Sequence, residues 1–400
     1  MQPAKTKPAI LNGPKAVTLE HSQATRWPIL TEEDESAVLQ VMRDGDLSCH
    51  RVTRELEDDY RRYFSERHAL AHCNGTAALL AAFFALDLQP GDEVLAPSAT
   101  FWASVLPMLW LGSVPVFCES EMDRLGLDPE DAERKITSRT RAIVVVHLWG
   151  MPSKMTELFA LGKKYHLKVV EDASHAQGAT WRGRQCGTLG DVSVFSLQSS
   201  KLAPAGEGGI LLTNDDAIME RAICLGDIDR IRGLDSPSRR FAAISFGVKT
   251  RMASLSAAVG RVQLRHLAER NSQRNDNIEY LSERLGVQTF RSPAHIQRVY
   301  FEYLVRLPAS QMPRDLLVRA LQAEGCEAAF PRYPLLHQQP IFTEGLFARI
   351  ARLDGNVRRY AEDDLPKTTR ANMELLRLPS FPKMQIGLCW MSTRSHLKRY

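Results

Sequence analysis

The sequence predicts an α/β protein in which helices cover a mainly parallel sheet. From about residue 66, short apolar runs alternate with longer segments whose apolar residues recur at helical spacing. This alternation is typical of βα units. The chain has 400 residues, 44% hydrophobic and 24% charged, which is the composition of a globular protein with a sizeable core. We therefore expect a large domain with a seven-stranded sheet, followed by a smaller domain.

The elements of the large domain follow from apolar periodicity and turn signals. The expected strands are His68–His72, Glu93–Ala96, Pro115–Cys118, Arg141–His147, Lys168–Glu171, Val192–Leu197 and Gly209–Thr213. The expected helices between them are Thr76–Leu86, Ala103–Leu111, Pro129–Ile136 and Lys154–Tyr165. Each helix has a turn signal on either side.

After about Arg251 the character of the sequence changes. Leu255–Leu285 is rich in helix formers with few breakers, and predicts one long helix or two successive helices. A strand at Val299–Leu307 and a helix at Arg314–Glu324 then predict a smaller α+β domain. The expected division is an N-terminal extension at 1–26, a large domain at 27–255, and a small C-terminal domain with its connecting helix at 256–400.

Composition excludes several classes of function. The 51 Lys and Arg against 47 Asp and Glu give a net charge of only +4, with the two signs interspersed, so no nucleic-acid partner is expected. No apolar run approaches the roughly 18 residues of a spanning helix, and the first residues contain no secretory signal, so a cytoplasmic protein with no membrane partner is expected. The seven cysteines form no CxxC pair, and HExxH is absent, so no metal site is expected.

Three features at the ends of expected strands carry candidate chemistry, because open parallel sheets bind ligands there. The turn containing Gly75 and Thr76 precedes a helix and suits an anion, although such a turn is also ordinary. Asp172 ends an apolar run and, taken alone, favours a helix cap. Ser196 and Lys201 lie in the next strand and the loop after it, where a lone lysine is usually solvated. Together they supply the phosphate cradle, ring partner and amine that a pyridoxal phosphate site requires.

The segment EDASHAQGATWRGRQCGTLGDVSVFSLQSSKLAPAGEGGILLTND contains two of these features. It resembles the core of the DegT/StrS-type sugar aminotransferases, fold-type I enzymes that use pyridoxal 5'-phosphate. The similarity extends from about Trp27 through NGTAALLAAFFAL and PGDEVLAPSATFWAS to FGVKTRMASLSAAVGRVQL, and so covers most of the chain.

The resemblance implies specific roles for these residues. Lys201 would form the Schiff base with the cofactor and then move the substrate proton as general base and acid. Asp172 would keep the pyridine nitrogen protonated, so that the ring accepts electrons. Gly75, Thr76 and Ser196 would contact the phosphate. Lys201 also argues against the dehydratase branch of the family, which has His at this position.

Four more residues receive roles from the resemblance. Phe101 would stack on the cofactor ring, with Trp102 as the competing assignment. His175 falls where the family has a Gln or His that hydrogen-bonds the phenolic oxygen of the cofactor. Gln198 occupies a cofactor-binding position close to the active lysine.

A further cofactor contact is expected from a neighbouring subunit. The family pattern Gly-x-Asn-x-Arg corresponds to Gly247–Arg251, and Lys249 stands where the Asn is usual. Lys249 would then make a charge-assisted phosphate contact or face substrate. A homodimer with shared active sites is implied.

The function implied is transfer of an amino group from glutamate or glutamine to the keto group of a nucleotide-linked keto-sugar. Two alternatives stay open: a glutamine:inosose aminotransferase that acts on a cyclitol, and a non-catalytic regulatory protein that binds pyridoxal phosphate. A nicotinamide-linked oxidoreductase is disfavoured because no GxGxxG follows an expected strand.

Overall fold

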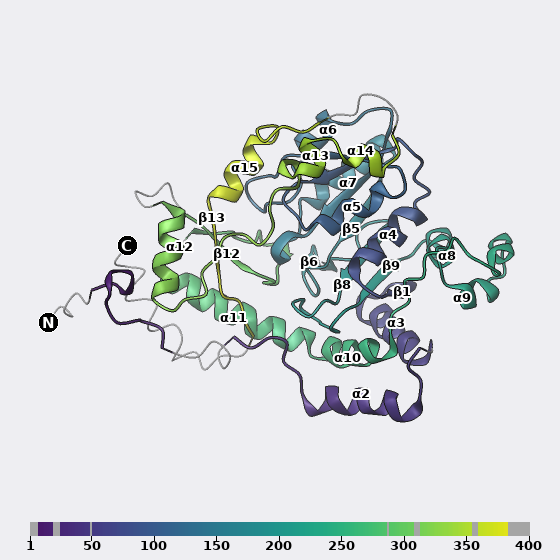
Figure 1. Ribbon diagram of the computed structural model, residues 1–400, viewed down its shortest axis with the longest axis horizontal. Coiled ribbons are helices and arrows are strands. Elements are labelled where there is room, and N and C mark those ends of the chain that lie inside the picture. Colours follow the sequence, from purple (N-terminus) through teal and green to yellow (C-terminus); the bar gives the residue numbers. More distant parts are fainter. Residues whose placement is uncertain are drawn as a thin grey trace.

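A computed structural model describes residues 7–18, 25–48, 50–285, 288–307, 313–353 and 359–382. Its centre is a seven-stranded sheet with the strand order β1-β9-β8-β5-β4-β2-β3 (Figure 1). The strands are β1 (His68–His72), β2 (Glu93–Pro97), β3 (Val114–Cys118), β4 (Thr140–Val146), β5 (Lys168–Asp172), β8 (Val192–Ser196) and β9 (Gly209–Thr213). Strand β9 runs antiparallel to β1 and β8, and the other pairs are parallel. The predicted fold class is confirmed, and each strand expected for the large domain is found within one residue of its predicted bounds.

Helices flank the sheet and extend beyond it. They are α2 (Glu32–Asp44), α3 (His50–Phe64), α4 (Gly75–Ala85), α5 (Leu106–Leu109), α6 (Pro129–Arg134), α7 (Met155–Tyr165), α8 (Asp216–Cys224) and α9 (Ile228–Arg232). Helix α2 packs on α10 (Ser254–Arg265), and α9 packs on α8. Helix α4 packs on β8 and β9, and α7 packs on β5. The sequence of α4, GTAALLAAFFA, is apolar on every side, which fits a helix enclosed by the sheet and its neighbours.

The helix expected at Ala103–Leu111 is wrong in its length. The chain forms a short 3-10 turn at Trp102–Ser104 and then the single helical turn of α5, Leu106–Leu109. Pro107 lacks an N–H group and so cannot continue a helical hydrogen-bond pattern from the preceding turn. The Ser104 hydroxyl also donates to the carboxylate of Asp172, a contact that periodicity does not reveal.

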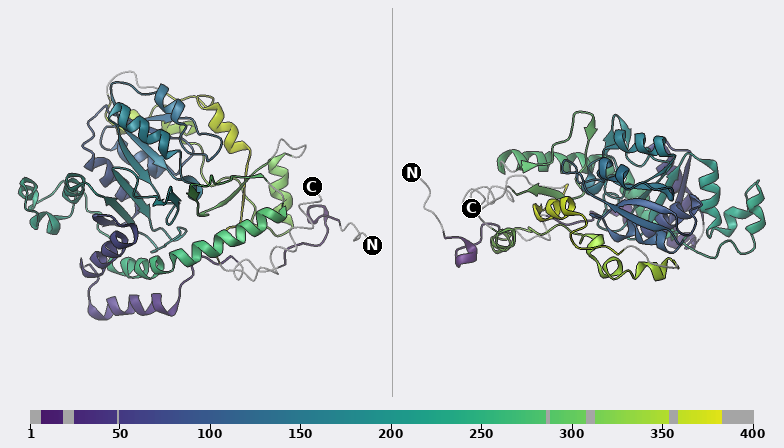
Figure 2. Two further views of the ribbon diagram at one scale, coloured as in Figure 1. Left: turned by 180° about the vertical axis from the view of Figure 1, so that it is seen from behind. Right: turned by 90° about the horizontal axis from the view of Figure 1, so that it is seen from above.

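Two successive helices, α10 (Ser254–Arg265) and α11 (Leu267–Leu285), connect the large sheet to a smaller unit. They follow one another along the lower side of the molecule in Figure 1 and in the left view of Figure 2. The smaller unit contains β10 (Gln288–Thr289), β12 (Tyr303–Arg306), β13 (Leu375–Leu378) and α12 (Arg314–Ala323). The helices α13 (Pro340–Thr343), α14 (Phe347–Ile350) and α15 (Pro366–Met373) come from the same part of the chain, but their buried residues Phe342, Phe347 and Ala371 pack in the core of the large sheet. The strand expected at Val299–Leu307 is therefore shorter than predicted. A small second sheet joins β6 (Thr180–Trp181), β7 (Arg184–Gln185) and β11 (Ile296–Gln297).

The smaller unit has its own apolar core, built around Tyr303, Leu321 and Leu376. The predicted domain boundaries stay a prediction, and parts of the segments 1–26 and 256–400 fall outside the described residues.

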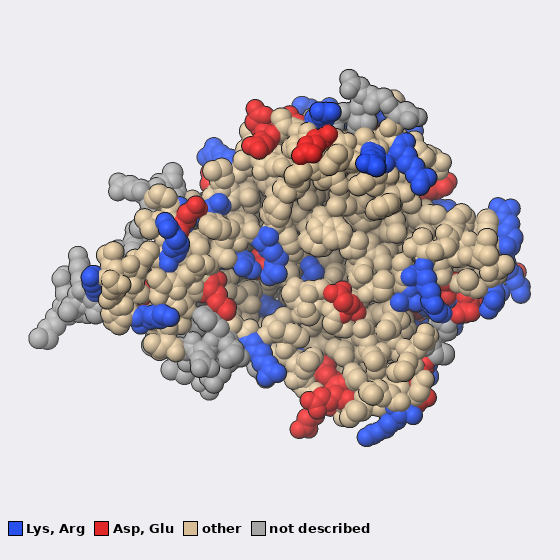
Figure 3. Space-filling view, in the orientation of Figure 1, with Lys and Arg blue, Asp and Glu red and all other residues tan. Residues whose placement is uncertain are grey.

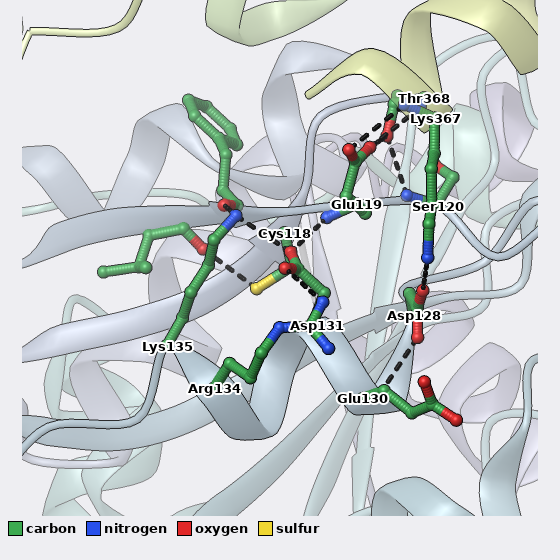
Figure 4. Close-up of polar contacts among 12 residues, drawn as sticks. Cys118, Glu119, Ser120, Asp128, Glu130, Asp131, Arg134, Lys135, Lys367 and Thr368 are labelled. Atoms are coloured by element: carbon green, nitrogen blue, oxygen red, sulfur yellow. Dashed lines mark hydrogen bonds and ion pairs between the residues drawn. The ribbon is translucent and has the colours of Figure 1, made fainter. Parts of the chain in front are cut away.

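The buried carboxylate of Glu119, which follows β3, binds the N-terminus of helix α15 (Figure 4). Glu119 accepts the backbone N–H groups of Lys367 and Thr368 at 3.1 and 2.8 Å, which lie in the first turn of α15. Its own N–H donates to Asp131 at 2.7 Å. An anion at a helix N-terminus satisfies free N–H groups and opposes the helix dipole. This contact holds the C-terminal segment against the large sheet.

The described residues include no helix with the length and apolar character needed to cross a membrane. Among the same residues, no cluster of three or more His, Cys, Asp or Glu side chains is suited to a metal ion. Acidic and basic side chains are interspersed over the face drawn in Figure 3, in keeping with the small net charge.

Candidate active site

A cavity of about 720 Å³ opens where the parallel strands end. Asp172 and Ser196 are the last residues of β5 and β8, and both line the cavity. Eight of the nine predicted site residues line it: Gly75, Thr76, Phe101, Asp172, His175, Ser196, Gln198 and Lys201. The ninth, Lys249, does not. The structure thus brings together residues from positions 75 to 201 of the chain.

The N-terminus of α4 forms one wall of the cavity. Asn74 caps the helix, and its side-chain oxygen accepts the N–H of Ala77 at 2.8 Å. The N–H groups of Gly75 and Thr76 belong to the first turn, where no intrahelical acceptor exists. A side chain at Gly75 would place its Cβ 2.8 Å from the Cβ of Ser196, so only glycine permits this approach. Free N–H groups and a hydroxyl at a helix N-terminus suit a phosphate.

Asp172 presents a fixed carboxylate to the cavity. Only 6% of the residue is exposed. Its Oδ2 accepts a hydrogen bond from the Ser104 hydroxyl at 2.6 Å, and its Oδ1 accepts one from the Ser174 N–H at 3.2 Å. The Ser104 oxygen lies 2.9 Å from that of Thr100. Two donors therefore orient Asp172, which fits a carboxylate held toward a cationic ring nitrogen.

Lys201 lies in the loop between β8 and β9, and only 8% of the residue is exposed. Its Nζ lies 4.6 Å from the centre of the Phe301 ring. Burial lowers the pKa of Lys201 to about 8; the Asp172 carboxylate opposes this shift and the Arg332 guanidinium adds to it. The lysine is therefore poised between its charged and neutral forms near neutral pH.

The backbone of Lys201 is held from two directions. Its N–H donates to the carbonyl of Gln198 at 2.8 Å, and its carbonyl accepts the indole N–H of Trp27 at 3.1 Å. The Gln198 side-chain oxygen accepts the N–H and hydroxyl of Ser200, at 2.8 and 2.7 Å. Gln198 thus shapes the lysine loop as well as lining the cavity.

His175 is buried and belongs to a group of nearly parallel rings. Its ring centre lies 4.1 Å from that of Phe301 and 5.4 Å from that of Trp149. Burial, with Lys201 and Arg332 nearby, holds the pKa of His175 well below its usual range, so the ring is neutral. The Trp149 N–H donates to Nδ1 at 3.4 Å, which places the proton on Nε2, 3.1 Å from the Tyr333 hydroxyl oxygen.

In this tautomer, His175 Nε2 donates a hydrogen bond to the Tyr333 hydroxyl oxygen. The hydroxyl proton of Tyr333 can then be donated to a different acceptor. The predicted contact of His175 with the phenolic oxygen of a cofactor stays a prediction. Phe101 and Trp102 both line the cavity, with ring centres 4.8 Å apart, so both stacking assignments also stay open.

Lys249 is exposed and lies near a second hollow, together with Glu57, Asp227 and Arg251. The adjacent Thr250 carbonyl accepts the Cys73 N–H at 2.6 Å, which fixes this segment beside the end of β1. Lys249 therefore lies outside the cavity.

Several residues in or next to the cavity were not identified from the sequence. Ser104 orients Asp172, Arg332 and Tyr333 come from the C-terminal part of the chain, and Phe301 underlies Lys201. The prolines at 331 and 334 mark an extended loop around Arg332, but nothing local indicates that this loop reaches the cavity.

Comparison with known proteins agrees with this geometry. Residues 28–387 match the model of the DegT/DnrJ/EryC1/StrS aminotransferase family. The chain belongs to this family. It is 32% identical over 339 residues to a GDP-perosamine synthase of Caulobacter vibrioides, covering 83% of this chain and 86% of the relative. It is also 32% identical over 344 residues to an L-glutamine:2-deoxy-scyllo-inosose aminotransferase of Streptomyces kanamyceticus, covering 81% of each.

Solved structures of aminotransferases have the same fold as this chain. An aminotransferase from Psychrobacter cryohalolentis superposes with a TM-score of 0.84 at 25% identity, covering 94% of this chain and 99% of that one. This DegT/DnrJ/EryC1/StrS family member is thus an aminotransferase with the fold-type I architecture, and the predicted family and enzyme class are confirmed.

Proposed function

We propose that the protein uses pyridoxal 5'-phosphate to transfer an amino group from glutamate or glutamine to the keto group of a nucleotide-linked sugar. The observation that carries this proposal is one cavity containing the Lys201 amine, the Asp172 carboxylate and the N-terminus of α4. Bound pyridoxal phosphate supplies an aldehyde that takes up the amino group and a ring that takes up electrons. The donor set in the cavity fits that group.

The N-terminus of α4 would hold the phosphate. The N–H groups of Gly75 and Thr76 and the hydroxyl of Ser196, which line the cavity, would donate hydrogen bonds to it, and the helix dipole would add attraction for an anion. Asp172, held by Ser104 and Ser174, would keep the ring nitrogen protonated through a charge-assisted hydrogen bond.

Lys201 moves the proton. With a pKa of about 8, a substantial fraction of its amine is neutral near pH 7, and a neutral amine can accept the proton from the substrate Cα. The resulting ammonium returns the proton to the neighbouring carbon. Phe301 lies beside Nζ, and its apolar ring helps keep water from the site of proton transfer.

The proposal includes a homodimer with shared sites. Lys249 is exposed and outside the cavity of its own subunit, so its predicted phosphate contact would be made to a second copy. Mixing Lys201→Ala and Lys249→Ala homodimers tests this. A hybrid dimer regains one site with both lysines, so activity should reappear on mixing. If it does not, the proposal of shared sites is contradicted.

A cyclitol such as an inosose is the second candidate acceptor, favoured by the similarity to the Streptomyces kanamyceticus aminotransferase. A regulatory protein without turnover is less well supported, because Lys201 and Asp172 lie in the same cavity and a binding-only role does not need a buried lysine of lowered pKa.

A half-reaction tests the function. Purified protein loaded with pyridoxal phosphate should absorb in the visible, and borohydride treatment of one portion should fix the cofactor on Lys201, as located by peptide mass spectrometry. In a second portion that has not been reduced, glutamate or glutamine should bleach the visible band, and the correct keto-sugar or inosose should restore it. A protein that takes up no pyridoxal phosphate, or that no donor bleaches, would refute the proposal.

A further inference from the structure

Two exposed aromatic side chains lie side by side in the wall of the cavity. Phe101 is 37% exposed and Trp102 is 43% exposed, and their ring centres are 4.8 Å apart. Adjacent exposed rings inside a cavity indicate a surface that a ligand covers. The ring of pyridoxal phosphate would stack on one of the two, which leaves the other aromatic ring without an assigned ligand.

The order of the rings places Phe101 on the inner side. The Phe101 ring centre lies 5.4 Å from that of Tyr333, whose hydroxyl oxygen is 3.1 Å from Nε2 of the buried His175. Within the described part of the chain, Phe101 is the one aromatic ring close to Trp102. Phe101 therefore lies between Trp102 and the rings around His175, and Trp102 forms the outer end of this row.

The Trp102 side chain is carried by a fixed turn. Trp102 begins the 3-10 turn that ends at Ser104, and the Ser104 N–H donates to the Phe101 carbonyl at 3.1 Å. Ser104 is buried, and its hydroxyl donates to the carboxylate of Asp172 at 2.6 Å. The backbone of Trp102 is thus tied to the carboxylate that would hold the cofactor ring. A ligand on Trp102 would therefore have a set position relative to that ring.

We propose that Trp102 is the surface on which the six-membered ring of the amino acceptor stacks, while Phe101 stacks on the cofactor. This inference rests on the proposed function and names a residue that selects the acceptor. A pyranose or cyclitol ring has C–H groups on its faces and hydroxyl groups around its rim. The hydrogens of the C–H groups carry a small positive charge, so they pack favourably against the electron-rich face of an indole.

Other cavity residues supply partners for the hydroxyl groups of such a ring. Gln198, Ser200 and Glu207 line the same cavity, and Glu207 is exposed. The Glu207 carboxylate accepts hydrogen bonds, whereas the amide of Gln198 and the hydroxyl of Ser200 both accept and donate them. An apolar surface with a few polar groups beside it is the usual composition of a small-molecule site. Sugar and cyclitol ketones share this kind of ring, so Trp102 serves either acceptor.

The amino donor gains little from the same surface. Glutamate and glutamine are open chains without a ring to stack. Trp102 should therefore act in the half-reaction of the acceptor, and Phe101 should act in cofactor binding.

The first experiment separates the two aromatic residues without any turnover. The Kd for pyridoxal phosphate is measured by spectrophotometric titration of apoenzyme for Phe101→Ala, Trp102→Ala and wild type. Phe101→Ala should raise this Kd by about 3- to 10-fold, the range for one lost aromatic contact, and Trp102→Ala should barely change it. Trp110→Ala is the matched control, because Trp110 is 74% exposed and does not line the cavity. A Kd raised by Trp102→Ala but not by Phe101→Ala would reverse the two assignments and overturn the inference.

The second experiment measures the acceptor half-reaction. Holoenzyme is bleached with glutamate and freed of excess donor, and return of the visible band is followed at increasing concentrations of two ketones. The probes are 2-deoxy-scyllo-inosose and UDP-N-acetyl-3-dehydro-α-D-glucosamine. For each ketone that restores the wild-type band, Trp102→Ala should raise the apparent Kd by about 5- to 30-fold, because the ring loses a stacking partner and the apolar area it covers. Trp102→Phe should recover most of this affinity. Trp102→Leu, which is apolar but not flat, should not.

Several results would overturn the inference while the proposed function survives. A loss confined to the UDP-linked ketone would assign Trp102 to the nucleobase, and an equally large loss in bleaching by glutamate would show a structural role. Wild-type affinity in Trp102→Ala or Trp102→Leu would exclude stacking. If a donor bleaches wild type but neither ketone restores its band, the inference fails and amino transfer from the donor still stands. If wild type takes up no pyridoxal phosphate, or no donor bleaches it, the proposed function itself fails.

Discussion

The lowered pKa of Lys201 makes a quantitative prediction for the apoenzyme. An ordinary lysine with a pKa of about 10.5 is neutral in about 0.03% of molecules at pH 7, whereas a pKa of about 8 makes about 9% neutral. The neutral fraction at pH 7 is thus about 300-fold larger. The direction follows from burial, which disfavours the charged amine.

Competitive labelling with acetic anhydride measures this directly. The extent of acetylation at Lys201, determined by peptide mass spectrometry across a pH series, should rise with a midpoint near pH 8. Lys164 is the internal control, because its Nζ lies 2.7 Å from the Glu133 carboxylate and its pKa is raised above the usual value. Its midpoint should therefore lie well above that of Lys201.

The causes of the shift can be separated by substitution. Asp172 favours the charged amine, so Asp172→Asn should lower the midpoint of Lys201. Arg332 disfavours it, so Arg332→Gln should raise the midpoint. A Lys201 midpoint equal to that of exposed lysines would refute the reasoning, since labelling midpoints do not depend on how accessible the amine is.

Three further substitutions follow from contacts in the site. Asp172→Asn should keep bound cofactor but lower kcat by about 100-fold or more, measured in steady-state assays, because the ring loses its anionic partner. Gly75→Ala should weaken pyridoxal phosphate binding by roughly tenfold in a spectrophotometric titration, because its Cβ meets Ser196. Trp27→Phe should lower the free energy of unfolding by about 1 kcal/mol in urea denaturation, because the Lys201 carbonyl loses its donor.

For each of these three substitutions, one outcome would contradict the prediction. Unimpaired turnover of Asp172→Asn would remove its role at the ring nitrogen. Unchanged cofactor affinity in Gly75→Ala would show that the phosphate lies elsewhere. For Trp27→Phe, the matched control is Trp110→Phe, an exposed tryptophan for which stability should not change; equal losses in both variants would argue against the Lys201 contact.

The predictable part of the site is the part set by the sheet. Asp172 and Ser196 follow apolar runs, and parallel strands deliver their ends to one edge, so their proximity follows from the strand assignment alone. Lys201 and Gly75 join them through short loops. The local sequence pattern and the known arrangement of parallel sheets are therefore sufficient to predict that these residues lie together.

The rest depends on tertiary contacts that no local pattern encodes. Arg332 lies in a loop more than a hundred residues after Lys201, and its position depends on the buried pairing with Glu302. Trp27 reaches Lys201 from the other end of the chain. The helix expected at Ala103–Leu111 failed because its apolar spacing was helical while Pro107 interrupted the hydrogen bonds.

The parallel rings beside Lys201 connect the two parts of the chain. Trp149 and His175 belong to the large sheet unit, whereas Phe301 and Tyr333 come from the C-terminal part, and their planes lie within 6 to 16° of one another. Flat surfaces slide past each other more easily than they tilt. A shear of the C-terminal part along these planes would change the distance between Arg332 and Lys201 while the rings stay in contact.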